Sequence, residues 1–182
     1  MDLILETERV YMREMRIEDA TAILKMDSNP AVHTYLWQTP ISEISEIEKY
    51  ILYVRTQYEK HTIGRFSTFL KATDELIGWT GIKYVDDHIE NGKTNFYDYG
   101  YRLNEDFWNK GYATEASEAW LHYAFNQMQI EELNAYTHAE NGASNRILGK
   151  IGMIDMQTYP DEKGVNWKWW QLLAKNYRNN KK

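Results

Sequence analysis

One segment near the middle of the chain most limits what the sequence can fold into. Residues 97–103 (Tyr-Asp-Tyr-Gly-Tyr-Arg-Leu) have the alternation of a β-strand, and residues 111–116 (Gly-Tyr-Ala-Thr-Glu-Ala) have the composition of a helix start. A short turn through Trp108, Asn109 and Lys110 joins them. A strand that passes through a turn into a helix leaves the first helical N–H groups without acceptors. Because these groups lie at the positive end of the helix dipole, they are suited to bind a phosphate.

The residues of this turn fit that interpretation without proving it. Gly111 allows a ligand to approach the backbone closely, and Lys110 adds a positive charge. Asn109 raises the steric cost if its φ has to be positive. Taken alone, the turn is equally consistent with an ordinary helix start.

The rest of the chain predicts runs of strands with helical crossovers. Strands are expected over residues 9–13, 66–71, 76–85, 95–103, 133–138, 153–158 and 165–174. Helices are expected over residues 17–26, from Ser42 onward with Ile44, Ile47, Ile51 and Val54 on one side, after Gly111, and from Asn141 to about Lys150. Residues 32–40 are expected to form a loop or short helical turn, and residues 178–182 a frayed tail.

This order of elements predicts an α/β (α+β) fold. It would have one mixed, mostly antiparallel sheet of about seven strands, flanked by about four helices. Neither an internal repeat nor a Gly, Ser or Pro-rich linker interrupts the pattern, so residues 1–182 are expected to form a single domain.

The composition excludes several classes of chemistry. The chain has no cysteine, which rules out disulfides and cysteine nucleophiles and favours a reducing compartment. The five histidines lack metal-ligand spacing, so no metal is expected, and no phosphate-loop signature of nucleoside triphosphate enzymes is present.

The charge is unevenly distributed along the chain. The net charge is −6, and all of it falls in residues 1–91, which contain 10 Lys and Arg and 16 Asp and Glu. An acidic chain is unsuited to bind a nucleic-acid backbone. An acidic site would favour a cationic ligand, and the alternative is that the negative charge only keeps the protein soluble. With no membrane-length apolar stretch and no signal peptide at Met1, we expect a cytoplasmic protein without membrane attachment.

A second motif follows about thirty residues after Gly111. Residues 138–153 read His-Ala-Glu-Asn-Gly-Ala-Ser-Asn-Arg-Ile-Leu-Gly-Lys-Ile-Gly-Met. The two segments together resemble the acyl-CoA-binding core of the GNAT acetyltransferase superfamily, and most of all its ribosomal-protein N-terminal (Rim-type) branch. That branch has W-G-K-G-Y-A-T-E-A where residues 108–116 stand. Its later pattern, N-x-x-S-x-x-x-L-x-K-x-G-F, is matched at Asn141, Ser144, Leu148, Lys150 and Gly152, with Met153 in place of Phe. The opening residues 7–13 and the pair Asn29-Pro30 are also similar to this branch.

The resemblance implies acetyl-CoA as acyl donor and assigns residues to it. The diphosphate would be held by backbone N–H groups of Asn109, Lys110, Gly111, Tyr112, Ala113 and Thr114. The pantetheine amides would pair with the strand end at Tyr101, Arg102 and Leu103, as an added strand does. Asn141 would bind near the reactive end of the cofactor while capping its helix, and Arg146 and Lys110 would meet the adenosine phosphates.

Acyl transfer to an amine requires a base, because the acceptor arrives as an ammonium with a pKa near about 10.4. Asp98 stands where the branch often has a Glu, before Tyr99-Gly100-Tyr101. Strand alternation predicts that Asp98, Gly100 and Arg102 share one face of the sheet. Asp98 is therefore the candidate base, and the alternative is a structural or substrate-positioning ion pair with a cation such as Arg102.

The departing thiolate benefits from an acid, for which two candidates remain. Ser144 matches the serine of the Rim-type pattern and is otherwise a first-turn helix residue, and Tyr136 on the preceding strand is the reserve. The oxyanion donor implied by the resemblance is a backbone N–H near Tyr101.

The expected function is transfer of an acetyl group from acetyl-CoA to a primary amine, either a protein N-terminus or a small molecule. Trp37 is the candidate acceptor-binding residue, because it follows the first helix where acceptors of the superfamily bind. The alternative is a CoA-binding sensor without turnover. Many relatives are dimers, so the resemblance also raises the expectation of a homodimer.

Overall fold

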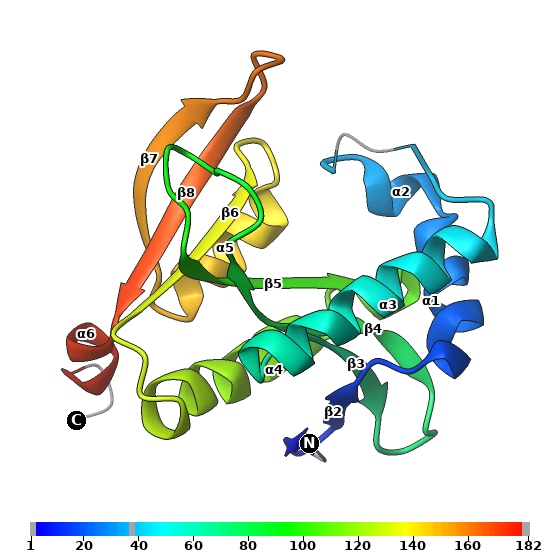
Figure 1. Cartoon of the computed structure of the whole chain (residues 1–182). Coiled ribbons are helices and arrows are strands. Elements are labelled where there is room, and N and C mark those ends of the chain that lie inside the picture. Colours follow the sequence, from blue (N-terminus) through cyan, green and yellow to red (C-terminus); the bar gives the residue numbers. More distant parts are fainter. Residues whose placement is uncertain (1–2, 37–38, 180–182) are drawn as a thin grey trace.

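One sheet of eight strands runs through the part of the chain that the structure, a computed structural model, describes: residues 3–36 and 39–179 (Figure 1). The strands are β1 (Ile4–Glu6), β2 (Val10–Glu14), β3 (Arg65–Leu70), β4 (Leu76–Val85), β5 (Phe96–Leu103), β6 (Glu132–His138), β7 (Ile154–Pro160) and β8 (Asn166–Leu173). Their order is β1-β2-β3-β4-β5-β6-β8-β7, and only β5 and β6 are parallel neighbours. The predicted mixed, mostly antiparallel sheet is confirmed, and β1 is the strand that the sequence pattern did not reveal.

The helices fall largely where the sequence predicts them. They are α1 (Ala20–Asp27), α2 (Pro30–His33), α3 (Ile44–His61), α4 (Tyr112–His122), α5 (Gly142–Lys150) and α6 (Ala174–Asn179), with 3-10 turns at Ile17–Asp19 and Glu105–Phe107 and a π turn at Tyr123–Gln127. The sequence predicts a frayed tail over residues 178–182. Arg178 and Asn179 instead belong to α6, whose Tyr177 stacks on Phe125 with ring centroids 4.9 Å apart, and residues 180–182 lie outside the described residues.

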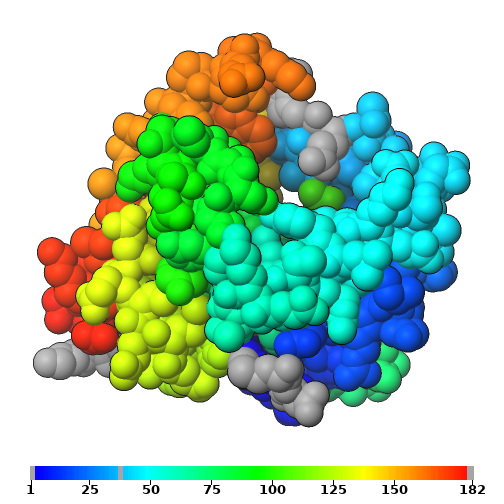
Figure 2. Space-filling view, viewed as in Figure 1, coloured from blue at the N-terminus to red at the C-terminus, as the bar shows by residue number. Residues whose placement is uncertain are grey.

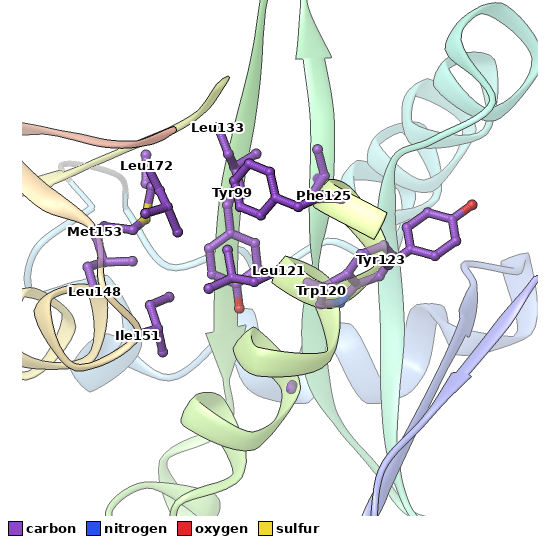
Figure 3. Packing of buried hydrophobic residues seen from close by; sticks show 14 of the residues in the cluster. Tyr99, Trp120, Leu121, Tyr123, Phe125, Leu133, Leu148, Ile151, Met153 and Leu172 are labelled. Atoms are coloured by element: carbon purple, nitrogen blue, oxygen red, sulfur yellow. The ribbon is translucent and has the colours of Figure 1, made fainter. Parts of the chain in front are cut away.

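The helices α4 and α5 cover one face of the sheet. Trp120 of α4 is fully buried, packs edge-on against Phe66 of β3, and donates its indole N–H to the Thr80 hydroxyl at 2.9 Å. Figure 3 shows Tyr99 of β5 and Leu148 of α5 in the same hydrophobic cluster. The cluster fixes both helices against β5 and β6, and therefore fixes the turn that precedes α4.

The helices α1 and α3 cover the opposite face. Ile47, Ile51 and Val54 recur along α3 at helical spacing and are all buried against α1 and against Trp79 of β4. The predicted helix start at Ser42 is wrong by two residues. Its hydroxyl approaches the neighbouring Glu43 side chain at 3.5 Å, and α3 begins at Ile44 without a side-chain cap.

The strands β5 and β6 meet at a single residue pair. Every residue of β5 from Phe96 to Leu103 is paired with β4, whereas pairing with β6 is limited to Asp98 and Asn134. Beyond this pair the remainder of β5 has no strand on its other side within the described residues. Figure 2 shows the molecule hollowed between the β4–β5 connection (green), the β7–β8 hairpin (orange) and the α2–α3 region (blue to cyan). The candidate site lies at this point of separation.

Candidate active site

The turn before α4 presents unpaired backbone donors. Asn109 and Gly111 both adopt left-handed conformations, with φ of 58° and 85°. The first intrahelical bond of α4 runs from the Glu115 N–H to the Gly111 carbonyl at 3.0 Å. The N–H groups from Asn109 to Thr114 have no acceptor among the described residues. The strain expected at Asn109 is therefore present, and the donors needed for a phosphate are free.

The same turn is tied back to the end of β5. The indole N–H of Trp108 donates to the Leu103 carbonyl at 2.7 Å, so that carbonyl already has one partner. Lys110 is exposed, with its ammonium 5.5 Å from the centre of the Phe107 ring. Arg146 is likewise exposed on α5, where its guanidinium lies beside Gly142. Both cations are free to meet a ligand phosphate near the two helix starts.

On the α4–α5 side of β5, the side chains are joined by neutral hydrogen bonds. The Tyr99 hydroxyl lies 2.6 Å from that of Ser117 on α4, and the Tyr101 hydroxyl donates to that of Ser144 on α5 at 3.1 Å. The Asn141 side chain accepts the Ser144 N–H at 3.1 Å, which confirms Asn141 as the cap of α5. Burial raises the pKa of Tyr101 to about 12, although the bond to Ser144 opposes the shift. The structure thus brings Tyr101, Ser144 and Asn141 together beside the separation of β5 and β6.

On the opposite side of β5, Asp98 forms a buried ion pair with Arg65 of β3. The Arg65 guanidinium donates to the Asp98 carboxylate, to the Asp98 carbonyl at 2.8 Å and to the Gly81 carbonyl, and both side chains are buried. It reaches them across Gly100, where a β-carbon would lie 2.8 Å from the Arg65 Nη2 atom. The ion-pair alternative for Asp98 is therefore realised, with Arg65 rather than Arg102 as the partner.

Arg102 is instead paired with Asp27 at the end of α1. Its Nη1 atom donates to the Asp27 carboxylate at 2.8 Å, and Asp27 is buried. The guanidinium groups of Arg102 and Arg65 both lie over the Trp79 ring, 5.3 and 5.4 Å from its centre. The side chain of Arg102 therefore serves the packing of α1, and only its backbone is left for the predicted pairing with pantetheine.

Tyr136 lies on the same side of the sheet as Asp98, away from α5. Its neighbour Thr137 points to α5 and donates to Asn145 at 2.6 Å, so Tyr136 points to the other face. Its ring packs with those of Trp167 and Trp169 of β8, at 6.1 and 6.5 Å between centroids. Burial, followed by the negative charge of Asp98, raises the pKa of the Tyr136 hydroxyl. The two candidate acids therefore lie on opposite faces of the sheet.

The sequence analysis did not single out two cations at this site. Arg65 is the only cation of the strand Arg65–Leu70, and an arginine in so apolar a strand is the signal that could have identified it. Lys83 of β4 lies directly opposite Asp98 in the strand register and is half-buried. Burial lowers the pKa of Lys83, while the Asp98 carboxylate opposes the shift. Trp37 lies outside the described residues.

Two further findings concern the described residues as a whole. They contain no group of three or more His, Asp and Glu side chains placed to bind a metal ion. None of their helices has both the length and the apolar composition that a membrane crossing requires.

Comparison with known proteins agrees with the geometry of this site. Residues 9–154 match the model of the acetyltransferase (GNAT) domain family. An uncharacterized N-acetyltransferase, p20 of Bacillus licheniformis, is 30% identical over 178 residues, which cover 95% of this chain and 97% of the relative. The chain belongs to the GNAT acetyltransferase family. It is accordingly an N-acetyltransferase of the kind that takes its acetyl group from acetyl-CoA.

Solved structures share the fold. A GNAT-family acetyltransferase from Bacillus anthracis superposes with a TM-score of 0.78 at 22% identity, covering 95% of this chain and 99% of that one. RimL, a ribosomal alpha-N-protein acetyltransferase in complex with coenzyme A, superposes with a TM-score of 0.77 at 14% identity, covering 94% and 98%. The GNAT fold inferred from the sequence is confirmed.

Proposed function

We propose that this enzyme acetylates a primary amine, a protein N-terminus or a small molecule, by direct attack of the amine on acetyl-CoA. The observation that supports this most is the separation of β5 from β6 after Asp98 and Asn134. It leaves the end of β5, from Tyr99 to Leu103, paired with β4 alone. The donor would enter from the α4–α5 face, and the acceptor from the face that holds Asp98.

The residues on the donor face fit acetyl-CoA. The free N–H groups from Asn109 to Thr114 would hold its diphosphate, with Lys110 and Arg146 near the adenosine phosphates. The unpaired side of β5 from Tyr101 to Leu103 would bind the pantetheine amides as an added strand. When bound, acetyl-CoA supplies an activated acetyl thioester.

The acceptor face holds the groups that would move the proton. Asp98 would take the proton that the acceptor ammonium gives up, directly or through one water, while Arg65 holds the carboxylate in place. The free amine then forms a bond to the acetyl carbon as the carbon–sulfur bond breaks, and the second proton of the attacking nitrogen passes to the departing sulfur. Ser144, oriented by Tyr101, would relay that proton and donate a hydrogen bond to the sulfur, and Tyr136 is the alternative donor from the other face.

A second candidate function rests on the same ion pair. The Asp98 carboxylate is buried and already bound by Arg65, which leaves it less accessible to an acceptor and favours a CoA-binding sensor without turnover. The two functions differ in one observable, since the enzyme releases free CoA thiol when an acceptor is present and the sensor releases none.

A two-stage experiment tests the proposal. Thermal melts with and without acetyl-CoA come first, and a hundredfold excess over Kd should stabilise the fold by about 2.7 kcal/mol. Thiol release is then measured over a panel of small amines and peptide N-termini. No melting shift at millimolar acetyl-CoA would overturn the proposal. A shift without thiol release from any acceptor would favour the sensor.

Substitutions then assign the roles. Asp98→Asn should lower the rate at neutral pH by a hundredfold or more if Asp98 is the base, with the affinity for CoA preserved. An unchanged rate would remove Asp98 from that role. Comparing Ser144→Ala with Tyr136→Phe identifies the acid as the residue whose loss lowers the rate more.

Two further parts of the proposal concern the whole protein. A cytoplasmic location remains a prediction, supported by the absence of cysteine from the sequence. A homodimer also remains a prediction, and light scattering at micromolar concentration checks it.

A further inference from the structure

The turn between β1 and β2 is hydrogen-bonded to the first turn of α4. The Thr7 hydroxyl and the Arg9 backbone N–H (2.8 Å) both donate to Oε1 of Glu115, and the Arg9 Nε donates to Oε2 at 2.6 Å. Burial raises the pKa of Glu115, but these hydrogen bonds outweigh it and hold the pKa below its ordinary value. Glu115 is therefore an anchor for Arg9.

The anchored guanidinium reaches the phosphate-binding turn itself. Its Nη1 atom donates to the Lys110 carbonyl at 3.0 Å, and the group lies 4.7 Å over the Tyr112 ring. Its Nη2 atom lies next to Gly111, where a β-carbon would be 3.2 Å away. Arg9 thus links the β1–β2 turn to the start of α4 and to the Lys110 carbonyl in the turn that precedes α4.

The contacted carbonyl determines where a neighbouring N–H group points. The Lys110 carbonyl and the Gly111 N–H belong to one planar trans peptide, so they point in opposite directions. Because the carbonyl points to Arg9, the N–H points away from it. The flanking residues Asn109 and Gly111 are both left-handed, and the Arg9 guanidinium is the side-chain group that contacts the peptide between them.

We propose that Arg9 is a positioning residue of the cofactor site, which holds the Gly111 N–H, through the Lys110 carbonyl, in the orientation that receives the diphosphate of acetyl-CoA. The inference rests on the proposed role of this turn in cofactor binding. The charge of Arg9 is matched by Glu115, so its effect depends on geometry more than on attraction to phosphate. Lysine, with a single ammonium, cannot reproduce contacts from separate nitrogens to Glu115 and Lys110.

The test is the Kd for CoA, measured by calorimetry on the full chain. Arg9→Gln and Arg9→Lys should each weaken binding about tenfold or more, the loss of a well-oriented hydrogen bond to a charged group. Lys71→Gln is the matched control, because it removes one cation from an exposed ion pair with Glu6 and should leave the Kd unchanged. Acetyl-pantetheine, which lacks the diphosphate, should bind the wild type and both Arg9 variants equally.

Each other outcome has a defined meaning. If Arg9→Lys binds CoA as tightly as the wild type, the effect of Arg9 is a simple charge effect and the inference is overturned. Equal losses of affinity for CoA and acetyl-pantetheine would indicate a general loss of folding and would also overturn it. Failure of the wild type to bind CoA would overturn the proposed function as well. If Arg9→Gln does not fold, Arg9→Lys remains, and the amide signal of Gly111 in its NMR spectrum should shift without ligand. An unshifted Gly111 signal would overturn the inference.

Discussion

The side chains on the two faces of β5 are held in place by different kinds of interaction. On the α4–α5 face, Tyr99 and Tyr101 make neutral hydroxyl bonds to Ser117 and Ser144. On the other face, Asp98 makes a buried ion pair with Arg65 of β3, on the far side of β4, and Arg102 makes one with Asp27 at the end of α1. The charged face is the one proposed to receive an ammonium, and the neutral face is the one proposed to receive the uncharged pantetheine. One strand thereby separates two environments suited to two different substrates.

The difference also predicts how each face responds to mutation. A neutral hydrogen bond contributes about 1 kcal/mol, whereas loss of one partner from a buried ion pair leaves a charge without compensation. Stability should therefore be far more sensitive to substitution on the charged face.

The largest effect is expected for Arg65→Met, which leaves the Asp98 carboxylate buried and unpaired. The free energy of unfolding should fall by about 3–5 kcal/mol, measured by urea denaturation. The double variant Arg65→Met with Asp98→Asn should recover part of the loss, because the uncompensated charge is gone. A loss below about 1 kcal/mol for the single variant would contradict the difference between the faces.

Tyr99→Phe makes the matched change on the neutral face. Ser117 also donates to the Ala113 carbonyl at 2.6 Å, so the substitution removes a single hydroxyl bond and leaves Ser117 with a partner. The same urea measurement should show a loss of about 1 kcal/mol. A loss as large as that of Arg65→Met would mean that the two faces do not differ in this way.

The smallest effect is expected at the partly exposed pair of Glu115 and Arg9. Because the pKa of Glu115 lies below its ordinary value of 4.5 in the folded state, its stabilising contribution is present above that value. It is lost as the pH falls through the folded-state pKa. Wild type should therefore exceed Glu115→Gln by at most about 1 kcal/mol at neutral pH, and the difference should shrink in acid. A difference that grows below pH 4 would contradict this assignment.

The fold was largely predictable because its signals are local. The alternation of residues 97–103 and the helical spacing of Ile47, Ile51 and Val54 predict a strand and a helix that the structure confirms. The three-residue strand β1 is too short to show a period. The helix α6 depends on Tyr177 stacking on Phe125, a contact about fifty positions away that no local pattern reports.

The parts of the candidate site that depend on local backbone structure were predictable from the sequence. The side-chain partners that come from distant positions were not. The turn at Asn109 to Gly111 and the cap at Asn141 follow from residue type and position. The partner of Asp98 is different, because Arg65 lies 33 residues earlier and reaches it only across the strand register. Arg102 is closer in sequence to Asp98, but its nearest buried carboxylate in space is Asp27.

The passage of Arg65 over Gly100 has an evolutionary consequence. A β-carbon at position 100 would lie 2.8 Å from the guanidinium, so any other residue there would push the arginine away from Asp98. The three positions should therefore change together among relatives. Family members without glycine at position 100 are expected to lack the arginine at position 65 as well. At position 98 they should carry an uncharged residue, or a carboxylate that pairs with a different cation.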